Sequence, residues 1–168
     1  MKEIKLTQGK VALVDDADFE WLNQYKWFAN KQGNSFYAVR NTPWIDGHRT
    51  QVSMHRQILN LTDPNIFGDH RDRNGLNNQR NNLRVATRSQ NGTNRRSWGD
   101  SKYLGVHKVV YKKGGRQKKD YEYWRATIKE GDKVKLIGLF HDEVEAAKAY
   151  NKTAIKIHGE FANLNIIQ

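Results

Sequence analysis

Residues 67–91 read FGDHRDRNGLNNQRNNLRVATRSQN, and they decide the fold of the middle of the chain. The stretch predicts a strand that carries Asp69 and His70, a long Asn-rich loop, a second strand at residues 83–87 and then a helix. Thr87 and the Gln three positions later form a capping box, which starts that helix and places Asn91 in its first turn. Adjacent strand residues point to opposite sides, so a strand end or bulge is expected at Asp69 and His70.

Asp69, His70 and Asn91 are residue types that phosphodiester hydrolysis by a single divalent ion uses. A carboxylate with an amide or imidazole holds the metal, a base activates water, and positive charge surrounds the phosphates. Capped turns also contain adjacent Asp and His residues, so the spacing of these residues alone leaves a purely structural interpretation open.

The first 50 residues predict a small β-rich module without a catalytic pattern. A strand at residues 10–14 is followed by a short helix that Asp16 or Asp18 caps. Two β-rich runs then flank Gly33, which suits a hairpin loop.

A short helix is predicted from Ser53 onward, because Met54, Ile58 and Leu61 fall on one helical face. His55 lies beside that face. As a single helical histidine it is interpreted as a packed or hydrogen-bonding residue, and no chemistry is assigned to it.

Residues 103–168 predict a second unit of three strands and one amphipathic helix, preceded by a linker at residues 98–102. A capping box at Asp142 starts the helix, and Gly159 ends it. The helix covers one sheet face, which leaves the other face available for a partner. The predicted strands are residues 103–108, 123–129 and 133–140.

The composition of the 168 residues excludes several classes of protein. The absence of cysteine removes disulfides and thiolate zinc sites. No apolar run reaches the roughly 18 residues of a membrane span, and the N-terminus lacks the apolar core of a signal peptide. We therefore expect a cytoplasmic protein without a membrane partner, located in the host cell if a phage encodes it.

Most of the formal net charge of +11 lies in residues 84–125, where twelve basic and three acidic residues give +9. Such a field attracts a polyanion. Aromatic residues interleave with the charges, which favours nucleic-acid binding over a solvated linker. An acidic membrane surface is a weaker alternative, because the stretch contains no basic amphipathic helix.

The blocks SMHRQIL at residues 53–59, GDHRDRNG at 68–75 and NNLRVATRSQN at 81–91 resemble the HNH endonucleases of phages and mobile introns. The resemblance implies a ββα-metal core over residues 51–97. It makes His70 the general base, Asp69 and Asn91 the metal ligands, and Asn82 a structural residue that braces the loop between the strands. An amide oxygen ligand suits Mg²⁺ or Mn²⁺.

Residues 103–165 resemble the Apetala-two/ethylene-response DNA-binding domain, through YLGV at 103–106, WRATI at 124–128, IGLF at 137–140, EAA at 145–147 and NLN at 163–165. In that family the exposed sheet face enters the major groove. Val134 and Leu136 stand where plant members have Arg and Trp, so a different target sequence is expected. The predicted DNA contacts are Arg84, Arg88, Arg95, Arg96, Lys102, His107, Lys108, Lys112, Lys113, Arg125, Thr127, Lys129, Lys133 and Lys135.

The sequence therefore predicts an α+β protein with an N-terminal module, a nuclease core and a C-terminal DNA-binding domain. Its expected activity is metal-dependent, site-recognising cleavage of double-stranded DNA without a small-molecule cofactor. Two alternatives stay open: a non-catalytic DNA-binding regulator with an inactive core, and a structure-specific or RNA-directed nuclease. A monomer and a homodimer are both open, because one core holds one active site.

Overall fold

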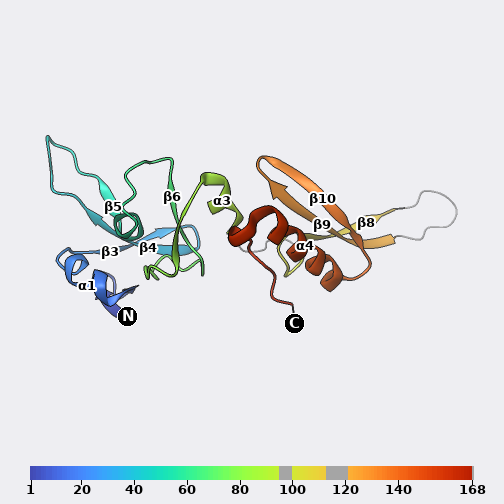
Figure 1. Cartoon of the computed structure of the whole chain (residues 1–168), viewed down its shortest axis with the longest axis horizontal. Coiled ribbons are helices and arrows are strands. Elements are labelled where there is room, and N and C mark those ends of the chain that lie inside the picture. Colours follow the sequence, from blue (N-terminus) through green and yellow to red (C-terminus); the bar gives the residue numbers. More distant parts are fainter. Residues whose placement is uncertain (95–99, 113–120, 168) are drawn as a thin grey trace. The chain divides into compact units, whose positions relative to one another are not determined.

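The computed structural model describes residues 1–94, 100–112 and 121–167. The chain divides into two compact units, Met1–Asn91 and Gly92–Gln168 (Figure 1). Both units combine strands with helices in small antiparallel sheets, which confirms the predicted α+β class. Within the described ranges, no helix is long and apolar enough to cross a membrane.

The first unit consists of three small sheets, with strand orders β1-β2, β3-β4-β5 and β6-β7, and short helices between them. Gly33, in the left-handed region at φ 56°, closes the predicted β3–β4 hairpin. The elements are β1 (Lys2–Lys5), β2 (Val11–Val14), α1 (Asp16–Leu22), β3 (Phe28–Gln32), β4 (Ser35–Asn41), β5 (Gln51–Ser53), α2 (Met54–Ile58), β6 (Phe67–His70), β7 (Leu83–Ala86) and α3 (Arg88–Thr93), the last of which crosses into the second unit.

The start of α1 differs from its prediction. Asp15, and neither Asp16 nor Asp18, is the N-cap residue, and its side chain makes no capping hydrogen bond. The carboxylates of Asp15 and Asp18 make long-range contacts instead. Asp15 accepts from the Arg80 backbone N–H at 2.8 Å, and Asp18 pairs with the Arg80 guanidinium at 2.7 Å. Long-range partners thus replace the local cap that the sequence suggests.

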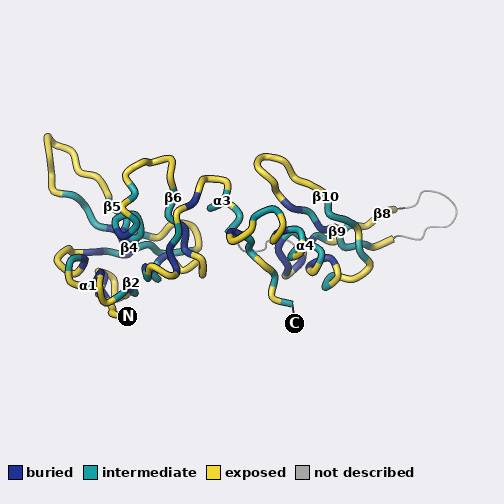
Figure 2. The backbone as a smooth tube through the Cα atoms, viewed as in Figure 1, coloured by how far each residue is buried: buried dark blue, intermediate teal, exposed yellow. Residues whose placement is uncertain are grey.

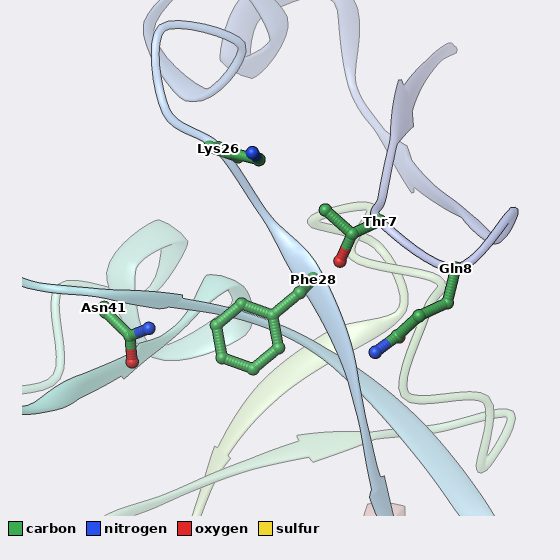
Figure 3. A pocket seen from close by; sticks show the side chains of 5 residues that line it. All are labelled: Thr7, Gln8, Lys26, Phe28 and Asn41. Carbon is green, nitrogen blue, oxygen red and sulfur yellow. The ribbon is translucent and has the colours of Figure 1, made fainter.

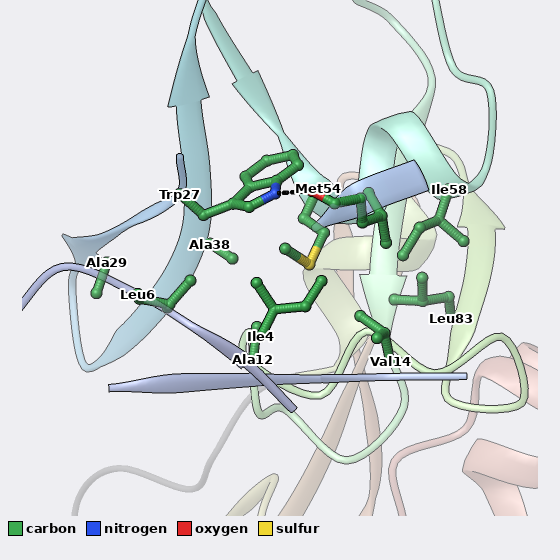
Figure 4. Close-up of a cluster of buried hydrophobic side chains, with 11 residues drawn as sticks. Ile4, Leu6, Ala12, Val14, Trp27, Ala29, Ala38, Met54, Ile58 and Leu83 are labelled. Carbon is green, nitrogen blue, oxygen red and sulfur yellow. Dashed lines mark hydrogen bonds between the residues drawn. The ribbon is translucent and has the colours of Figure 1, made fainter. Parts of the chain in front are cut away.

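One hydrophobic core fills the first unit (Figure 4). Trp27 belongs to this core and is buried, and its indole N–H donates to the Leu22 carbonyl at 2.8 Å. Ile4 from β1 packs in the same cluster as Met54 from α2 and Leu83 from β7. Residues of the predicted N-terminal module, before position 50, therefore share a single core with residues of the predicted nuclease core that follows it. Figure 2 shows the buried segments of the unit.

The second unit is a three-stranded antiparallel sheet with strand order β10-β9-β8 and one long helix. The Asp142 side chain accepts from the Glu145 N–H at 2.8 Å, and Gly159 ends the helix with φ 53°, which confirms both predicted caps. The helix buries Ala146, Ala147, Tyr150 and Ala154. The elements are β8 (Val106–Tyr111), β9 (Tyr121–Glu130), β10 (Lys133–Phe140), α4 (Glu143–His158) and a short 3-10 helix, η1 (Gly159–Phe161).

Candidate active site

The β6–β7 pair positions the predicted site. Its register places Asp69 opposite Arg84 and His70 opposite Leu83. His70 is the last residue of β6, so the strand end expected at this position is present. Side chains of directly opposite residues lie on the same sheet face, which explains why Asp69 meets Arg84.

Asp69 and Arg84 form a buried ion pair. The Nε and Nη2 atoms of Arg84 each lie 2.7 Å from Oδ2 of Asp69. Their side chains are only 5% and 9% exposed, so solvent screens the attraction weakly. Arg84 is one of the predicted DNA contacts; its guanidinium pairs with Asp69, and its side chain is 9% exposed.

His70 is a buried imidazole, with 5% of its surface exposed. Its Nε2 atom lies 3.4 Å from Oδ1 of Asn78, a residue with no exposed surface. Burial lowers the pKa of His70, and it outweighs the Asn78 hydrogen bond and the charges of Asp72 and Asp69, which act in the opposite direction. The ring is therefore neutral at neutral pH and can accept a proton.

The loop between the two strands is held by Asn82, which is 8% exposed. Its side-chain N–H donates to Oδ1 of Asp72 at 2.9 Å and to the Asn77 carbonyl at 2.8 Å. Its amide oxygen accepts from the Asp72 backbone N–H at 3.0 Å. These three bonds join the two ends of the loop and fix the path of the chain that follows His70.

Asn91 lies on α3, directly after β7. The predicted capping box is present: the Thr87 N–H donates to the Gln90 side chain at 2.8 Å, and the Gln90 N–H donates to the Thr87 hydroxyl at 3.2 Å. The Asn91 N–H donates to the Thr87 carbonyl at 2.9 Å, so the first turn is helical.

A metal ion would have few protein ligands here. Across the described ranges, no three His, Cys, Asp or Glu side chains are grouped so that they could hold one. The predicted ligands, Asp69 and Asn91, offer one carboxylate and one amide oxygen. Mg²⁺ commonly takes one or two carboxylates and keeps several waters, so one carboxylate and one amide oxygen are donors of the kind that a hard cation takes.

His55 is a site neighbour that sequence reasoning missed. Its ring centroid lies 4.9 Å from that of His70, with the planes at 70°. The Tyr37 ring lies 5.9 Å from His55 and 5.7 Å from His70. Helical spacing gave no signal for this cluster, because it depends on how α2 packs against β6.

A separate pocket of about 490 Å³ lies elsewhere in the first unit (Figure 3). Its lining consists of Thr7, Gln8, Lys26, Phe28 and Asn41. No predicted catalytic residue belongs to this lining, so the pocket is distinct from the β6–β7 site.

The sheet of the second unit has two faces. One buries Ala126 and Ile128, and the other carries several predicted DNA contacts. Alternation along β9 directs Arg125, Thr127 and Lys129 to this face. The register then places His107 opposite Arg125, Leu136 opposite Thr127 and Val134 opposite Lys129. Val134 is 69% and Leu136 63% exposed, so the face is basic on β9 and aliphatic on β10.

Several of the other predicted contacts have protein partners. Lys108 pairs with Glu122 at 2.8 Å, Lys129 lies 3.9 Å from Asp132, and Lys135 pairs with Glu130. The Arg88 guanidinium lies 5.9 Å from the Phe67 ring centroid, and the Lys102 ammonium lies 5.0 Å from that of Tyr103. Lys112 and Lys133 are exposed, whereas Arg95, Arg96 and Lys113 lie outside the described residues.

Comparison with known proteins identifies the family. The chain is 30% identical over 165 residues to an uncharacterized HNH endonuclease of Acanthamoeba polyphaga mimivirus, and the match covers 95% of this chain and 77% of the relative. No protein-family model matches the sequence. No solved structure matches it either. The chain therefore belongs to the HNH endonucleases, and the similarity extends over both of its units.

Proposed function

We propose that this protein is a metal-dependent, site-recognising DNA endonuclease of the homing type. His70 is the base that activates water, and Asp69 and Asn91 are the ligands of one Mg²⁺ or Mn²⁺. The observation that carries the proposal is a buried imidazole next to a buried carboxylate at the end of β6; burial lowers the pKa of the imidazole, which favours its neutral form. Family membership supports a DNA substrate.

The chemistry assigned to His70 follows from its surroundings. Nε2 of His70 faces the Asn78 side-chain amide at 3.4 Å, and a neutral imidazole keeps one ring nitrogen without a proton, so the ring can accept one. Water adds its oxygen to phosphorus as its proton passes to His70, and the bond to the leaving sugar oxygen breaks; that oxygen takes a proton from solvent. A bound divalent ion would supply positive charge to stabilise the phosphate and the leaving oxygen.

Arg84 positions the carboxylate for this reaction. Two of its donors, Nε and Nη2, contact the same oxygen, Oδ2 of Asp69, at 2.7 Å. Such charge-assisted hydrogen bonds are stronger than neutral ones, so they hold that oxygen beside the guanidinium. Arg84 thereby holds Asp69 in one orientation before DNA binds.

We further propose that the outer sheet face of the second unit binds duplex DNA, as its resemblance to the Apetala-two domain implies. The pairing of His107 with Arg125 on neighbouring strands and the exposure of Arg125 support this assignment. Arg125→Ala should weaken DNA binding and reduce its salt dependence, because fewer counterions are released. Lys152→Ala, on α4 across the sheet, is the matched control and should bind as wild type.

The nuclease is tested with supercoiled plasmid that carries the protein's genomic neighbourhood, incubated with Mg²⁺, Mn²⁺ or EDTA. The proposal is supported if nicked or linear product forms with metal and not with EDTA, and if this plasmid is cleaved in preference to an unrelated one. His70→Ala should abolish cleavage while DNA is still bound, whereas the exposed His48→Ala should cleave normally. Intact plasmid under every condition, with DNA still shifted in a gel, would favour the alternative of a non-catalytic DNA-binding regulator.

A further inference from the structure

Three rings from three different elements meet at the proposed base. His55 comes from α2, Tyr37 from β4 and His70 from β6. Their centroids are 4.9 to 5.9 Å apart, and the planes are inclined by 55° to 70°. Ring pairs prefer offset or edge-to-face arrangements over face-to-face stacking, so these contacts favour particular planes of the rings.

Gly68 makes room for His55. Residues 68 and 70 share one face of β6, since side chains alternate along a strand. A Cβ at Gly68 would lie only 2.5 Å from Cδ2 of His55, well inside van der Waals contact. The His55 ring therefore occupies the space beside His70 that a side chain at position 68 would otherwise fill.

The buried imidazole of His55 is not explained by packing alone. Its Nδ1 atom makes no hydrogen bond within the described part of the chain, although it is buried. An unsatisfied buried nitrogen destabilises the fold, because no hydrogen bond offsets the loss of its contact with water. An aliphatic side chain in the same place would avoid that loss, so stability gives no reason for a histidine here.

We propose that His55 is a positioning residue that holds the plane of the His70 imidazole by filling the space above Gly68. The inference rests on the proposed function of His70 as the base. His55 and Tyr37 both contact the His70 ring and also contact each other, and the Asn78 amide faces its Nε2 atom. A fixed ring plane keeps the imidazole nitrogens in constant directions, which proton transfer within hydrogen-bond reach requires.

The kinetic test compares His55→Ala with Met54→Ala. Met54 is the neighbouring residue on α2, is fully buried and belongs to the hydrophobic core, so its truncation also destabilises the unit. Both variants are assayed well below their unfolding temperatures. His55→Ala should lower kcat about 10- to 100-fold with an unchanged KM, because the ring of the base is no longer fixed. Met54→Ala should keep kcat within about twofold, and an equal kcat in the two variants would overturn the proposal.

A spectroscopic test separates this inference from the nuclease proposal. The ¹⁵N chemical shifts of the His70 ring report its tautomer without any turnover. We expect one fixed tautomer in the wild type and in Met54→Ala, and averaged shifts in His55→Ala. Unchanged His70 shifts in His55→Ala refute the positioning role even if the wild type cleaves DNA. Changed shifts with no cleavage by the wild type support positioning and refute the proposed function.

Discussion

Acid should destabilise the first unit through His55. Burial, followed by the charges of His70 and Arg56, lowers the pKa of His55 from 6.5 to about 3. The folded state therefore binds a proton more weakly than the unfolded chain does. The stability contributed by the neutral ring is complete above pH 6.5 and is lost as the pH falls toward about 3.

The size of the effect follows from this window. Each pH unit inside it lowers the free energy of unfolding by about 1.4 kcal/mol for one group. Acidification from about pH 7.5 to about pH 4.5 crosses two of these units and removes roughly 3 kcal/mol. The pKa of His70 is lowered in the same direction, so it adds to the loss. Domains are typically stable by only about 5–15 kcal/mol, so the change is easily measured.

The assay is urea unfolding at several pH values, read by pulsed hydrogen exchange and mass spectrometry. Peptides from residues 1–91 and 92–168 report the two units separately. His55→Gln, which is polar and does not titrate, is the comparison variant. Wild type should lose roughly 3 kcal/mol more than this variant between the two pH values. Equal pH dependence of both proteins in the first unit would refute the reasoning.

Three further outcomes are expected. Gly68→Ala should impair cleavage but not DNA binding, because its Cβ would collide with His55; normal kcat in this variant would contradict that account. Asn82→Ala removes three hydrogen bonds of a buried amide and should lower the unfolding free energy of the first unit by about 2–3 kcal/mol, with the second unit unchanged in the same urea experiment. Asp142→Ala removes the hydrogen bond that caps α4 at the Glu145 N–H. It should lower the unfolding free energy of the second unit by about 1 kcal/mol and leave that of the first unit unchanged. A loss of stability in the first unit would contradict this prediction.

Local chemistry made much of the fold predictable. The caps at Thr87 and Asp142 and the turn glycine Gly33 each act within a few residues, so their sequence patterns suffice. β1 was not predicted, because only Ile4 of its four residues is buried and the strand exists through pairing with β2. The Asp15 and Asp18 contacts with Arg80 span more than 60 residues, which no local pattern reveals.

The candidate site likewise contains residues that the sequence indicates and residues that only the tertiary structure brings in. Asp69 and His70 could be singled out through the resemblance of their sequence block to the HNH endonucleases, since their spacing alone leaves a structural interpretation open. Arg84 appeared to be one more basic residue, and only the β6–β7 register places it against Asp69. His55 was interpreted from its own helix, whereas its partners, His70 and Tyr37, come from strands at a distance in the chain.

The burial of the site determines its charge before DNA binds. Asp69 and Arg84 neutralise each other, and burial keeps His55 and His70 uncharged at neutral pH. A buried ion pair adds little net stability, because desolvation offsets the attraction. The pair is better explained by its effect on direction, since Arg84 fixes a carboxylate that water would otherwise leave mobile. Residues 92–125 carry ten basic and three acidic residues, so most of the excess positive charge of the chain lies outside the β6–β7 pair.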